Sequence, residues 1–485
     1  MRRALPIFGP GLAAGILLAF SLPPWGFWPL GPVGFAVLAW RLGGLSARRR
    51  LLAGIAAGTG QFAIGIFWIT EFQQVGFVAL LILETSFVAL AALITPPGRA
   101  RLFVLPAALA LAEAARGRWP FGGLPLGGVA LGQAGGPLAP TVRIGGPLLL
   151  LAVTVVAGVG LCELVAHRRL LVPAIATVIT VVLALLGAAD TAGRATGTLR
   201  VASVQGGGVR GLRAVTSDPQ AVYLRHADAT GRVQPPVDLV LWPEDVVDLD
   251  GPLAGAPEEV EIGLLAKALG TTLVAGVVEA AGPDHFRNAS VAWGPDGRVV
   301  DRYEKVHRVP FGEYLPLRGL ISHLAGTDLI PRDAIPGHGS GQIRTPSGPF
   351  GVVISYEVFF ADRARSGIRA GGEVLLVPTN AASFRTSQVP TQEVAAARLR
   401  ALETGRDVIQ AAPTGYGAVI DSRGRVLART HLGRQQVLQT VVHRRQGRTW
   451  YLRWGDGPVV TLALVLVAAG WIADRRRRTP LDRTV

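Results

Sequence analysis

Three segments of this sequence end a predicted strand with a side chain that could take part in acyl transfer. The apolar stretch 237–242 leads to the carboxylate Glu244, a second segment carries Lys305, and a third places the hydroxyl of Ser355 after β-branched residues. A base, a positive charge and a nucleophile are the groups that a reaction through a covalent acyl intermediate needs. The residue types therefore predict nucleophilic acyl or amide chemistry.

The residue types also assign a role to each group. Glu244 would be the general base, taking a proton from the nucleophile and returning it to a leaving group. Lys305 would place its charge beside the oxyanion of the tetrahedral intermediate. Only Lys267 and Lys305 among the 48 basic residues are lysines. An ammonium is a compact point charge whereas a guanidinium is a wide fork, so a lysine in this arginine-rich chain indicates a specific task.

Ser355 stands at a predicted junction between a strand and a helix. The apolar run 351–354 precedes it, and a polar helical pattern follows over 361–370. A sharp turn of this kind exposes a nucleophile at the end of a sheet. Each signal alone is weak, because a strand-end carboxylate is more often a cap and a lone lysine is usually solvated. Their occurrence together, each beside a predicted strand, is what makes the pattern specific.

The elements that must position these groups alternate between strand-like and helical patterns. This order predicts an α/β sandwich with a mixed sheet. The Pro-Asp-Gly turn at 295–297 indicates a hairpin between two of the strands. Predicted strands cover 199–205, 237–242, 272–278, 289–293, 298–303, 351–354, 374–377, 408–412, 417–420 and 425–429, and predicted helices cover 258–269, 361–370 and 388–404.

The remaining chain is too apolar for an ordinary soluble protein. Half of the 485 residues are hydrophobic, and the mean hydropathy is +0.40. The apolar residues concentrate in 1–190 and in 458–473. A membrane span needs about 20 mostly apolar residues. Candidate spans are 5–22, 25–42, 51–70, 75–94, 102–115, 146–166, 169–189 and 458–473.

The charge distribution predicts how these spans are oriented. The net charge is +15, but the arginines flank apolar runs, which is the positive-inside pattern and argues against nucleic-acid binding. With the N-terminus in the cytoplasm, the arginine-rich loops and the C-terminal tail fall inside. The segment 190–457 and the loop 116–145 fall outside. In that loop, Arg116, Arg118 and Arg143 are exceptions to the charge rule. The single cysteine, Cys162, allows no internal disulfide.

One predicted outer loop, 116–145, is apolar without a helical pattern. Irregular backbone near a membrane must face protein or a water-filled cavity. The loop is either an ordinary surface loop or part of a lipid-facing entrance to the active site.

The three chemical segments, in this order, resemble those of the apolipoprotein N-acyltransferases, which are membrane enzymes with a nitrilase-type (carbon–nitrogen hydrolase) domain. The resemblance runs from Pro23 to the segment 453–456. It implies an αββα nitrilase-like sandwich joined to a multi-span helical membrane domain. It also implies that Glu244, Lys305 and the residue at 355 form the catalytic triad. Supporting roles are implied for the second carboxylate and for two residues of the nucleophile motif, which are Glu313, Tyr356 and Glu357.

By this resemblance, a phospholipid gives an acyl chain to the nucleophile, which passes it to the N-terminal amine of a diacylglyceryl-cysteine lipoprotein. No cofactor and no metal are expected. The protein would be a multi-pass protein of the cell membrane with both termini in the cytoplasm. The expected domains are about seven transmembrane helices, an extracytoplasmic nitrilase-like domain, a C-terminal transmembrane helix and a basic cytoplasmic tail, over 1–190, 195–450, 456–474 and 475–485.

The sequence departs from the family motif at the nucleophile. The family has a cysteine where this chain has Ser355, and the only cysteine, Cys162, is predicted to lie on the other side of the membrane. The following loop differs too: 380–385 lacks the family's acidic residue and tryptophan, and Gln392-Glu393 stands where the family has Gln-His. Three functions stay open: an active acyltransferase, an impaired paralogue that acts as a membrane binding or regulatory partner, and a membrane-bound amidase.

Overall fold

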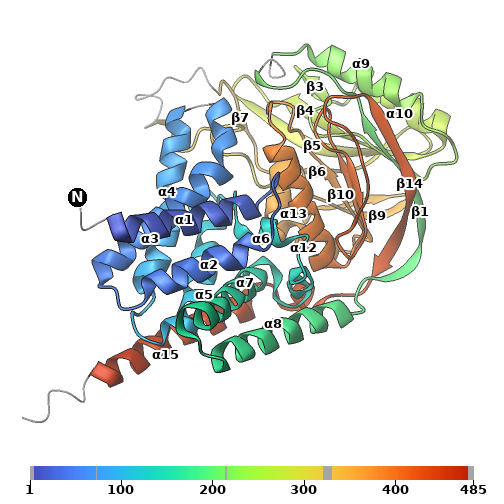
Figure 1. Cartoon of the computed structure of the whole chain (residues 1–485). Coiled ribbons are helices and arrows are strands. Elements are labelled where there is room, and N and C mark those ends of the chain that lie inside the picture. Colours follow the sequence, from blue (N-terminus) through green and yellow to red (C-terminus); the bar gives the residue numbers. More distant parts are fainter. Residues whose placement is uncertain (1–4, 73, 213–215, 320–329, 479–485) are drawn as a thin grey trace, which may run out of the picture. The chain divides into compact units, whose positions relative to one another are not determined.

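The chain divides into two compact units in the computed structural model, which describes residues 5–72, 74–212, 216–319 and 330–478. One unit joins Met1–Asp190 to Thr449–Val485, and the other is Thr191–Arg448. Among the described residues, the first unit is helical and the second contains the strands (Figure 1).

The helical unit is built from apolar helices. Four described helical segments are long and apolar enough to cross a membrane, namely Gln74–Ile94, Ala139–His167, Leu171–Ala189 and Gly457–Arg476, and two apolar helices are shorter. The orientation of these helices across a membrane stays a prediction. The principal helices are α1 (Leu5–Ser21), α2 (Leu30–Leu42), α3 (Ala47–Gly65), α4 (Gln74–Ile94), α5 (Arg101–Arg116), α7 (Val142–His167), α8 (Leu171–Ala189) and α15 (Gly457–Arg478).

Small residues let α1 and α3 approach closely. A Cβ atom on Gly15 would collide with the backbone of Ala57, and one on Gly60 would meet the carbonyl oxygen of Leu12. Lipid tails are as apolar as the helices, so association in a membrane depends on such close packing more than on the hydrophobic effect. The glycines of these helices therefore contribute to packing.

The predicted irregular loop 116–145 is only partly irregular. It contains the short helix α6 (Val129–Gln133) and the 3₁₀ turn η2 (Ala139–Thr141), and α7 already begins at Val142. The expectation of a loop without helix is therefore wrong for these residues. Glycine and proline hid the pattern, because α7 absorbs two non-helical glycines, Gly145 and Gly146, just inside its start.

The arginines that depart from the charge rule are paired. Arg116 is buried, and it donates to Glu84 at 2.7 Å, to Glu113 at 2.8 Å and to the carbonyl oxygen of Leu126. Arg118 forms an ion pair with Asp456 at 2.7 Å. A neutralised arginine contributes little to a charge bias, which accounts for these exceptions.

The α/β unit contains two sheets. The first has the order β14-β1-β2-β4-β5-β6, with β3 and β7 paired to β4 and β5, and the second has the order β13-β12-β11-β10-β9-β8. Both mix parallel and antiparallel pairs, as predicted. The first sheet contains β1 (Arg194–Gln205), β2 (Leu239–Leu241), β3 (Val247–Leu249), β4 (Thr272–Ala280), β5 (His285–Trp293), β6 (Val299–Glu304), β7 (Asp333–Ala334) and β14 (Gln436–Gln446).

The second sheet packs against the first through a shared apolar core. Side chains from both sheets, among them Val201, Leu241, Val352 and Leu376, form this core and are almost fully buried. The second sheet contains β8 (Gln342–Thr345), β9 (Gly348–Val352), β10 (Val374–Pro378), β11 (Val408–Ala411), β12 (Ala418–Ile420) and β13 (Val426–Arg429).

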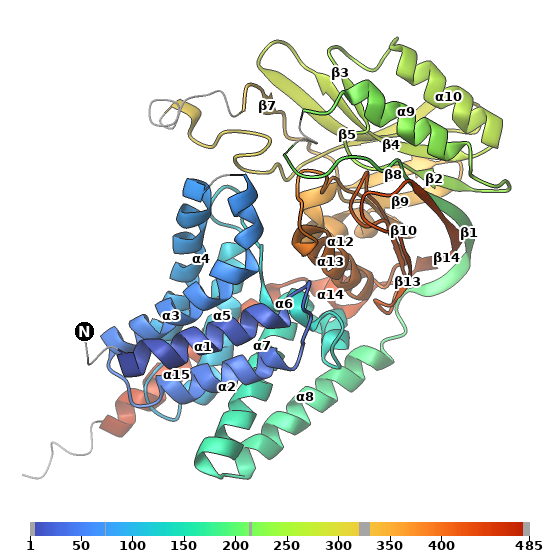
Figure 2. The same ribbon diagram turned by 45° about the horizontal axis from the view of Figure 1, so that its top comes forward.

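Helices cover the two outer faces of this sandwich. In Figures 1 and 2, α9 (Pro219–Thr230) and α10 (Pro257–Leu269) lie on the far side of the sheets from α12 (Ala361–Arg369) and α13 (Gln388–Thr404). A second core, which includes Tyr223, Trp242 and Ile262, joins α9 and α10 to the first sheet. The architecture is therefore the αββα sandwich that the sequence predicts.

Some elements were not predicted from the sequence. They are α9, β3, β7, β8 and β14. β14 forms the edge of the first sheet and is largely polar, because one of its faces remains accessible to solvent. Its polar composition hides the alternation that identifies a half-buried strand.

Candidate active site

Lys305 lies at the centre of a buried charge cluster. Its Nζ donates to Glu244 Oε1 at 2.8 Å and to Glu313 Oε1 at 2.6 Å, and the side chain is 2% exposed. Asn288 Nδ2 donates to the same two carboxylates, at 2.9 Å and 3.3 Å. The backbone N–H of Val309 donates to the other oxygen of Glu313 at 2.8 Å. The structure thus brings together three residues that the sequence singled out.

Strand ends supply these groups. Glu244 comes just after β2, and Lys305 is the residue after β6. Asn288 lies on β5, where the register Ala289↔Glu304 places it opposite Lys305. The backbone N–H of Lys305 donates to the carbonyl oxygen of Asn288 at 2.9 Å, which fixes the start of the lysine side chain. Because the neighbouring strands fix these positions, the ammonium group has little freedom to move.

The cluster holds Lys305 in its charged form. Burial lowers the pKa of Lys305, but Glu244 and Glu313 outweigh that effect and keep the pKa above its ordinary value. Burial raises the pKa of Glu313, and Lys305 opposes that shift. An ammonium that keeps its proton at any working pH acts as a fixed positive charge and cannot act as a base.

Ser355 occupies a strained turn. It follows β9 by three residues and opens the 3₁₀ turn η4 (Ser355–Phe359), with a backbone φ of +50°. Residues other than glycine rarely adopt this left-handed conformation, and strain of this kind clusters at functional sites. A turn between a strand and a helix is the arrangement that the sequence predicts at this position.

Glu357 ties this turn to the segment that carries Lys305. Its carboxylate accepts hydrogen bonds from the backbone N–H groups of Ile354, Val306 and His307 at 2.9, 2.8 and 3.0 Å, and from the hydroxyl of Tyr303 at 2.8 Å. The side chain is fully buried. Glu357 therefore holds the nucleophile turn beside the lysine segment, and its contacts are those of a positioning residue.

Tyr356, the remaining predicted site residue, is buried among aromatic side chains. Its ring meets Phe360 edge-on, with ring centroids 5.0 Å apart, and lies 6.3 Å from Phe359. These contacts favour a packing role for the ring.

Ser355 also contacts a group that the sequence did not single out. Its Oγ lies 3.4 Å from Thr379 Oγ1, and Thr379 Oγ1 lies 2.5 Å from Glu393 Oε1. All three side chains are buried. The pKa of Glu393 is raised to about 8, chiefly by burial; the bond from Thr379 and the charge of Lys305 oppose this shift, and the charge of Glu244 adds to it. This carboxyl is therefore within electrostatic reach of the lysine cluster.

The loop after Thr379 is linked to the end of the Glu244 segment. Asn380 Nδ2 donates to Asp245 Oδ2 at 3.3 Å, and Asn380 Oδ1 accepts from the backbone N–H of Ala382 at 3.1 Å. Burial, together with neighbouring carboxylates, raises the pKa of Asp245 well above its ordinary value. The altered loop thus contributes Asn380 to the same region of the unit.

Asn288 and Thr379 were not identified from the sequence. Asn288 comes just before the predicted strand 289–293, and Thr379 follows the predicted strand 374–377 without a charged group. Strand register could have found both. Asn288 pairs with Lys305, and the parallel register Leu376↔Val352 brings Thr379 beside Ser355 when it is continued by three residues.

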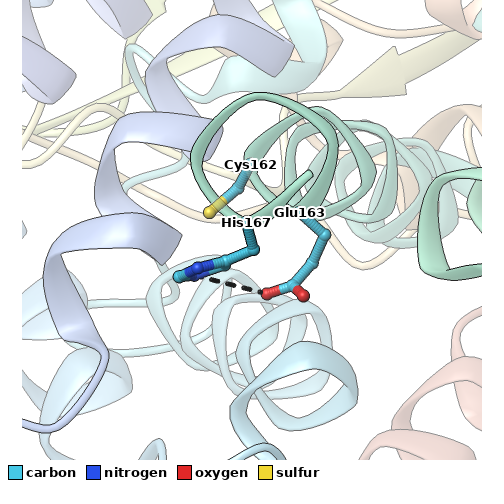
Figure 3. A group of neighbouring side chains, drawn as sticks. All are labelled: Cys162, Glu163 and His167. Atoms are coloured by element: carbon cyan, nitrogen blue, oxygen red, sulfur yellow. Dashed lines mark ion pairs between the residues drawn. The ribbon is translucent and has the colours of Figure 1, made fainter. Parts of the chain in front are cut away.

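One group in the helical unit has the residue types of a metal site. Cys162, Glu163 and His167 lie at the end of α7, with their ligand atoms within 4.8 Å of one another (Figure 3). Glu163, however, lies 3.4 Å from Arg101, 3.4 Å from Arg169 and 3.7 Å from His167. A divalent cation would meet two guanidinium groups at this carboxylate. The group is better explained as an ion-pair network.

Models of two protein families match this chain. The model of the apolipoprotein N-acyltransferase N-terminal domain matches residues 14–160, and the carbon-nitrogen hydrolase model matches residues 200–451. The yeast protein Nit3 (Saccharomyces cerevisiae), a member of branch 10 of the nitrilase superfamily, is 20% identical, with a TM-score of 0.40 over 61% of this chain and 99% of its own.

Relatives in two bacteria cover nearly the whole chain. The apolipoprotein N-acyltransferase of Azotobacter vinelandii is 33% identical, over 96% of this chain and 94% of its own length. That of Vibrio cholerae is 28% identical, over 96% of both chains. This chain is a membrane protein and belongs to the apolipoprotein N-acyltransferase family.

Proposed function

We propose that this chain is an apolipoprotein N-acyltransferase that uses Ser355 as its nucleophile. It moves an acyl chain from a phospholipid to Ser355, and then to the N-terminal amine of a diacylglyceryl-cysteine lipoprotein. The observation that supports this most is the buried Lys305, held between Glu244 and Glu313 and linked through Glu357 to the strained turn of Ser355.

The first half-reaction forms an ester on the enzyme. Ser355 Oγ attacks the carbonyl carbon of the phospholipid ester as its proton passes to a base, for which Glu244 is the candidate in the triad. The carbonyl oxygen becomes an oxyanion, and Lys305 stabilises it. Removal of one oxyanion donor typically costs a factor of about 10² to 10³ in rate. The intermediate then collapses, and the lysophospholipid leaves as an alcohol after it regains a proton.

The second half-reaction forms an amide. The unprotonated N-terminal amine of the lipoprotein attacks the ester carbon, and a proton of the amine returns to Ser355 Oγ as the ester bond breaks. The same lysine serves both halves, since each half passes through a tetrahedral oxyanion. The amide is the stable product, and the enzyme regains its free hydroxyl.

A serine makes the first half harder than a cysteine would. A thiol has a pKa near 8.5, whereas a hydroxyl lies closer to water, at about 15.7. The difference corresponds to roughly 10 kcal/mol of ionisation free energy. No neighbouring charge can hold an alkoxide in advance against that cost. Ser355 must therefore lose its proton during the attack, as in serine hydrolases.

The membrane setting is consistent with these substrates. Both the phospholipid and the lipoprotein anchor lie in a membrane, and the helical unit provides helices long enough to span one. We propose that both termini lie in the cytoplasm and that the α/β unit lies outside, as the arginine distribution indicates.

A second candidate function follows from Ser355 and the altered loop 380–385. The chain would then be an impaired paralogue that binds a membrane partner. The third candidate, an amidase, would transfer the acyl group of an amide to water.

Expression in cells that lack their own N-acyltransferase separates these functions. Mass spectrometry of lipoprotein N-termini measures acylation by wild type, Ser355→Ala, Ser355→Cys and the matched control Ser366→Ala, which changes a partly exposed serine of α12. We expect acylation from wild type, Ser355→Cys and Ser366→Ala, and none from Ser355→Ala.

Two other outcomes would contradict the proposal. Equal background acylation by wild type and Ser355→Ala, with activity in Ser355→Cys alone, identifies an impaired paralogue with an intact pocket. Release of acid from an amide substrate without lipoprotein acylation identifies an amidase.

A further inference from the structure

We propose that Thr379 and Glu393 form a proton relay that accepts the hydroxyl proton of Ser355. This inference rests on the proposed function, because it requires Ser355 to be the nucleophile. Thr379 contacts the reacting oxygen, whereas Glu393 is a positioning residue that acts through Thr379.

Strand register fixes the first contact of the relay. β9 and β10 are parallel neighbours, with Val352 opposite Leu376. Ser355 and Thr379 come three residues after this pair, beyond the carboxyl ends of the two strands. They lie side by side there, with their hydroxyl oxygens 3.4 Å apart. The backbone N–H of Thr379 donates to Ala411 on β11 at 2.9 Å. The position of the threonine hydroxyl is therefore set by the sheet and not by a free loop.

The single proton of Thr379 determines the direction of the relay. Its hydroxyl has one proton and two lone pairs. When Glu393 is ionised, that proton is donated to the carboxylate, 2.5 Å away, and a lone pair is left to accept from Ser355. When Glu393 is protonated, the carboxyl donates to Thr379 and Thr379 donates to Ser355. Only the ionised state can draw a proton away from Ser355.

Glu393 accepts fewer hydrogen bonds than Glu244. Two donors, Lys305 and Asn288, bind Glu244 Oε1 and stabilise its charge. Glu393 is buried on α13, and its Oε2 has no hydrogen-bond partner among the described residues. A buried carboxylate with so few donors holds a proton tightly, and for this reason it is the better acceptor for a hydroxyl proton.

The proton transfers balance over the two half-reactions. In the first, the Ser355 Oγ–H bond breaks as the Oγ–carbon bond forms. That proton moves to Thr379 while the proton of Thr379 moves to Glu393. Thr379 then gives its proton to the leaving alkoxide of the lysophospholipid, and Glu393 returns its proton to Thr379. In the second half, the proton that the attacking amine loses reaches Ser355 Oγ as the ester bond breaks, and Glu244 remains the base beside Lys305.

The first test compares a serine and a cysteine nucleophile, because a thiol needs far less help to ionise. Glu393→Gln keeps the shape of the side chain and removes the base. We expect it to lower kcat/KM about 100-fold with Ser355, in line with general base catalysis. With Ser355→Cys, the loss should be at least tenfold smaller. Thr379→Val should behave like Glu393→Gln, and Thr379→Ser, which keeps the hydroxyl, should rescue most of the activity.

The outcomes separate the relay from the function. If Glu393→Gln and Thr379→Val lower activity by the same factor with either nucleophile, the two residues have only structural roles and the relay is wrong, while the proposed function stands. If Ser355→Ala retains wild-type acylation, Ser355 is not the nucleophile and both proposals fall. Detergent-solubilised variants that elute as the wild type does in size exclusion exclude misfolding as the cause.

The pH profile gives an independent test. The charged groups that face Glu393 are Glu244 and Lys305, on the segments after β2 and β6. Burial raises the pKa of Glu393 to about 8. We expect kcat/KM of the full chain to rise with pH and to level off above about pH 8, and we expect Glu393→Gln to remove this rise. A rise that persists in Glu393→Gln would overturn the relay.

Discussion

Two clusters in this molecule each place one buried cation between two glutamates, and they differ in which cation it is. In the helical unit, Arg116 lies between Glu84 and Glu113; in the α/β unit, Lys305 lies between Glu244 and Glu313. The guanidinium donates to two carboxylates and to a backbone carbonyl. The ammonium has three protons, and the described residues account for two of them through the carboxylates. The comparison suggests that the arginine closes a structural network, whereas the lysine retains a donor for an oxyanion.

Exchanging the cation in each cluster should give opposite results. Lys305→Arg keeps the charge but replaces a point donor with a wide fork, so we expect acyl transfer to fall about 10²- to 10³-fold. Arg116→Lys should leave activity within a few-fold and lower thermal stability, because one ammonium cannot replace three directed hydrogen bonds. Lipoprotein acylation and melting temperature measure the two effects. Equal losses of acyl transfer in Lys305→Arg and Arg116→Lys would show that the two cations do not differ in their role in catalysis.

Neutralising one carboxylate in each cluster tests the same contrast. Glu244→Gln removes the triad's base, so we expect kcat to fall about 10²-fold. Glu84→Gln should cost about 1 to 3 kcal/mol of stability, because Arg116 loses a charged partner while buried. Kinetics of the purified chain and thermal unfolding in the same detergent give both numbers. A Glu84→Gln variant with normal stability would show that Arg116 needs no such partner.

Glu357 differs from the carboxylates of both clusters, because this buried carboxylate is held mainly by backbone N–H groups. Glu357→Gln replaces one carboxylate oxygen with an NH₂ group. That oxygen accepts either from the backbone N–H of Ile354 or from those of Val306 and His307. Two donors would then face each other, at a cost of about 1 to 3 kcal/mol. We expect activity to fall about tenfold, because a displacement of about 1 Å at a reacting group can cost up to 10²-fold. Unchanged kcat with lowered stability would show that the turn of Ser355 holds without this anchor.

The sequence alone predicted the members of this site that end strands. Glu244, Lys305 and Ser355 each follow a strand that the sequence predicts, and strand patterns are readable from one sequence. Asn288 and Thr379 were missed because only register across two strands places them. The pairing of Arg116 was missed for a related reason: Glu84 lies on another helix, 32 residues earlier in the chain. Residues joined by tertiary contacts leave no periodic signal in one sequence.

The structure also connects two departures from the family motif. Ser355 and Glu393 looked like separate changes in the sequence, and they are the two ends of one hydrogen-bonded chain through Thr379. A hydroxyl nucleophile needs a stronger base than a thiol does. The proposed relay gives the two changes one chemical explanation, which the sequence could not supply.

The smallest expected effect concerns Glu393, which has no cation among the hydrogen-bond partners in the described part of the chain. Burial raises its pKa from 4.5 to about 8. Between these values the native state keeps a proton that the unfolded chain has lost, so the free energy of unfolding falls as pH rises. The contribution is fully present below pH 4.5, is lost as pH rises to about 8, and changes no further above it.

Glu393→Gln cannot ionise, so its melting temperature should decline less than that of wild type between pH 5 and about pH 8, by a few degrees. Thermal unfolding of both proteins in one detergent across this range measures the difference. The lysine cluster supplies the contrast, because Lys305 keeps its charge throughout the range and offers no titration of its own there. If the melting temperatures of the two proteins change equally with pH, Glu393 does not lose a proton in this range. Its ionised form would then be stabilised at neutral pH, and Glu393 would not differ from the paired carboxylates around Lys305.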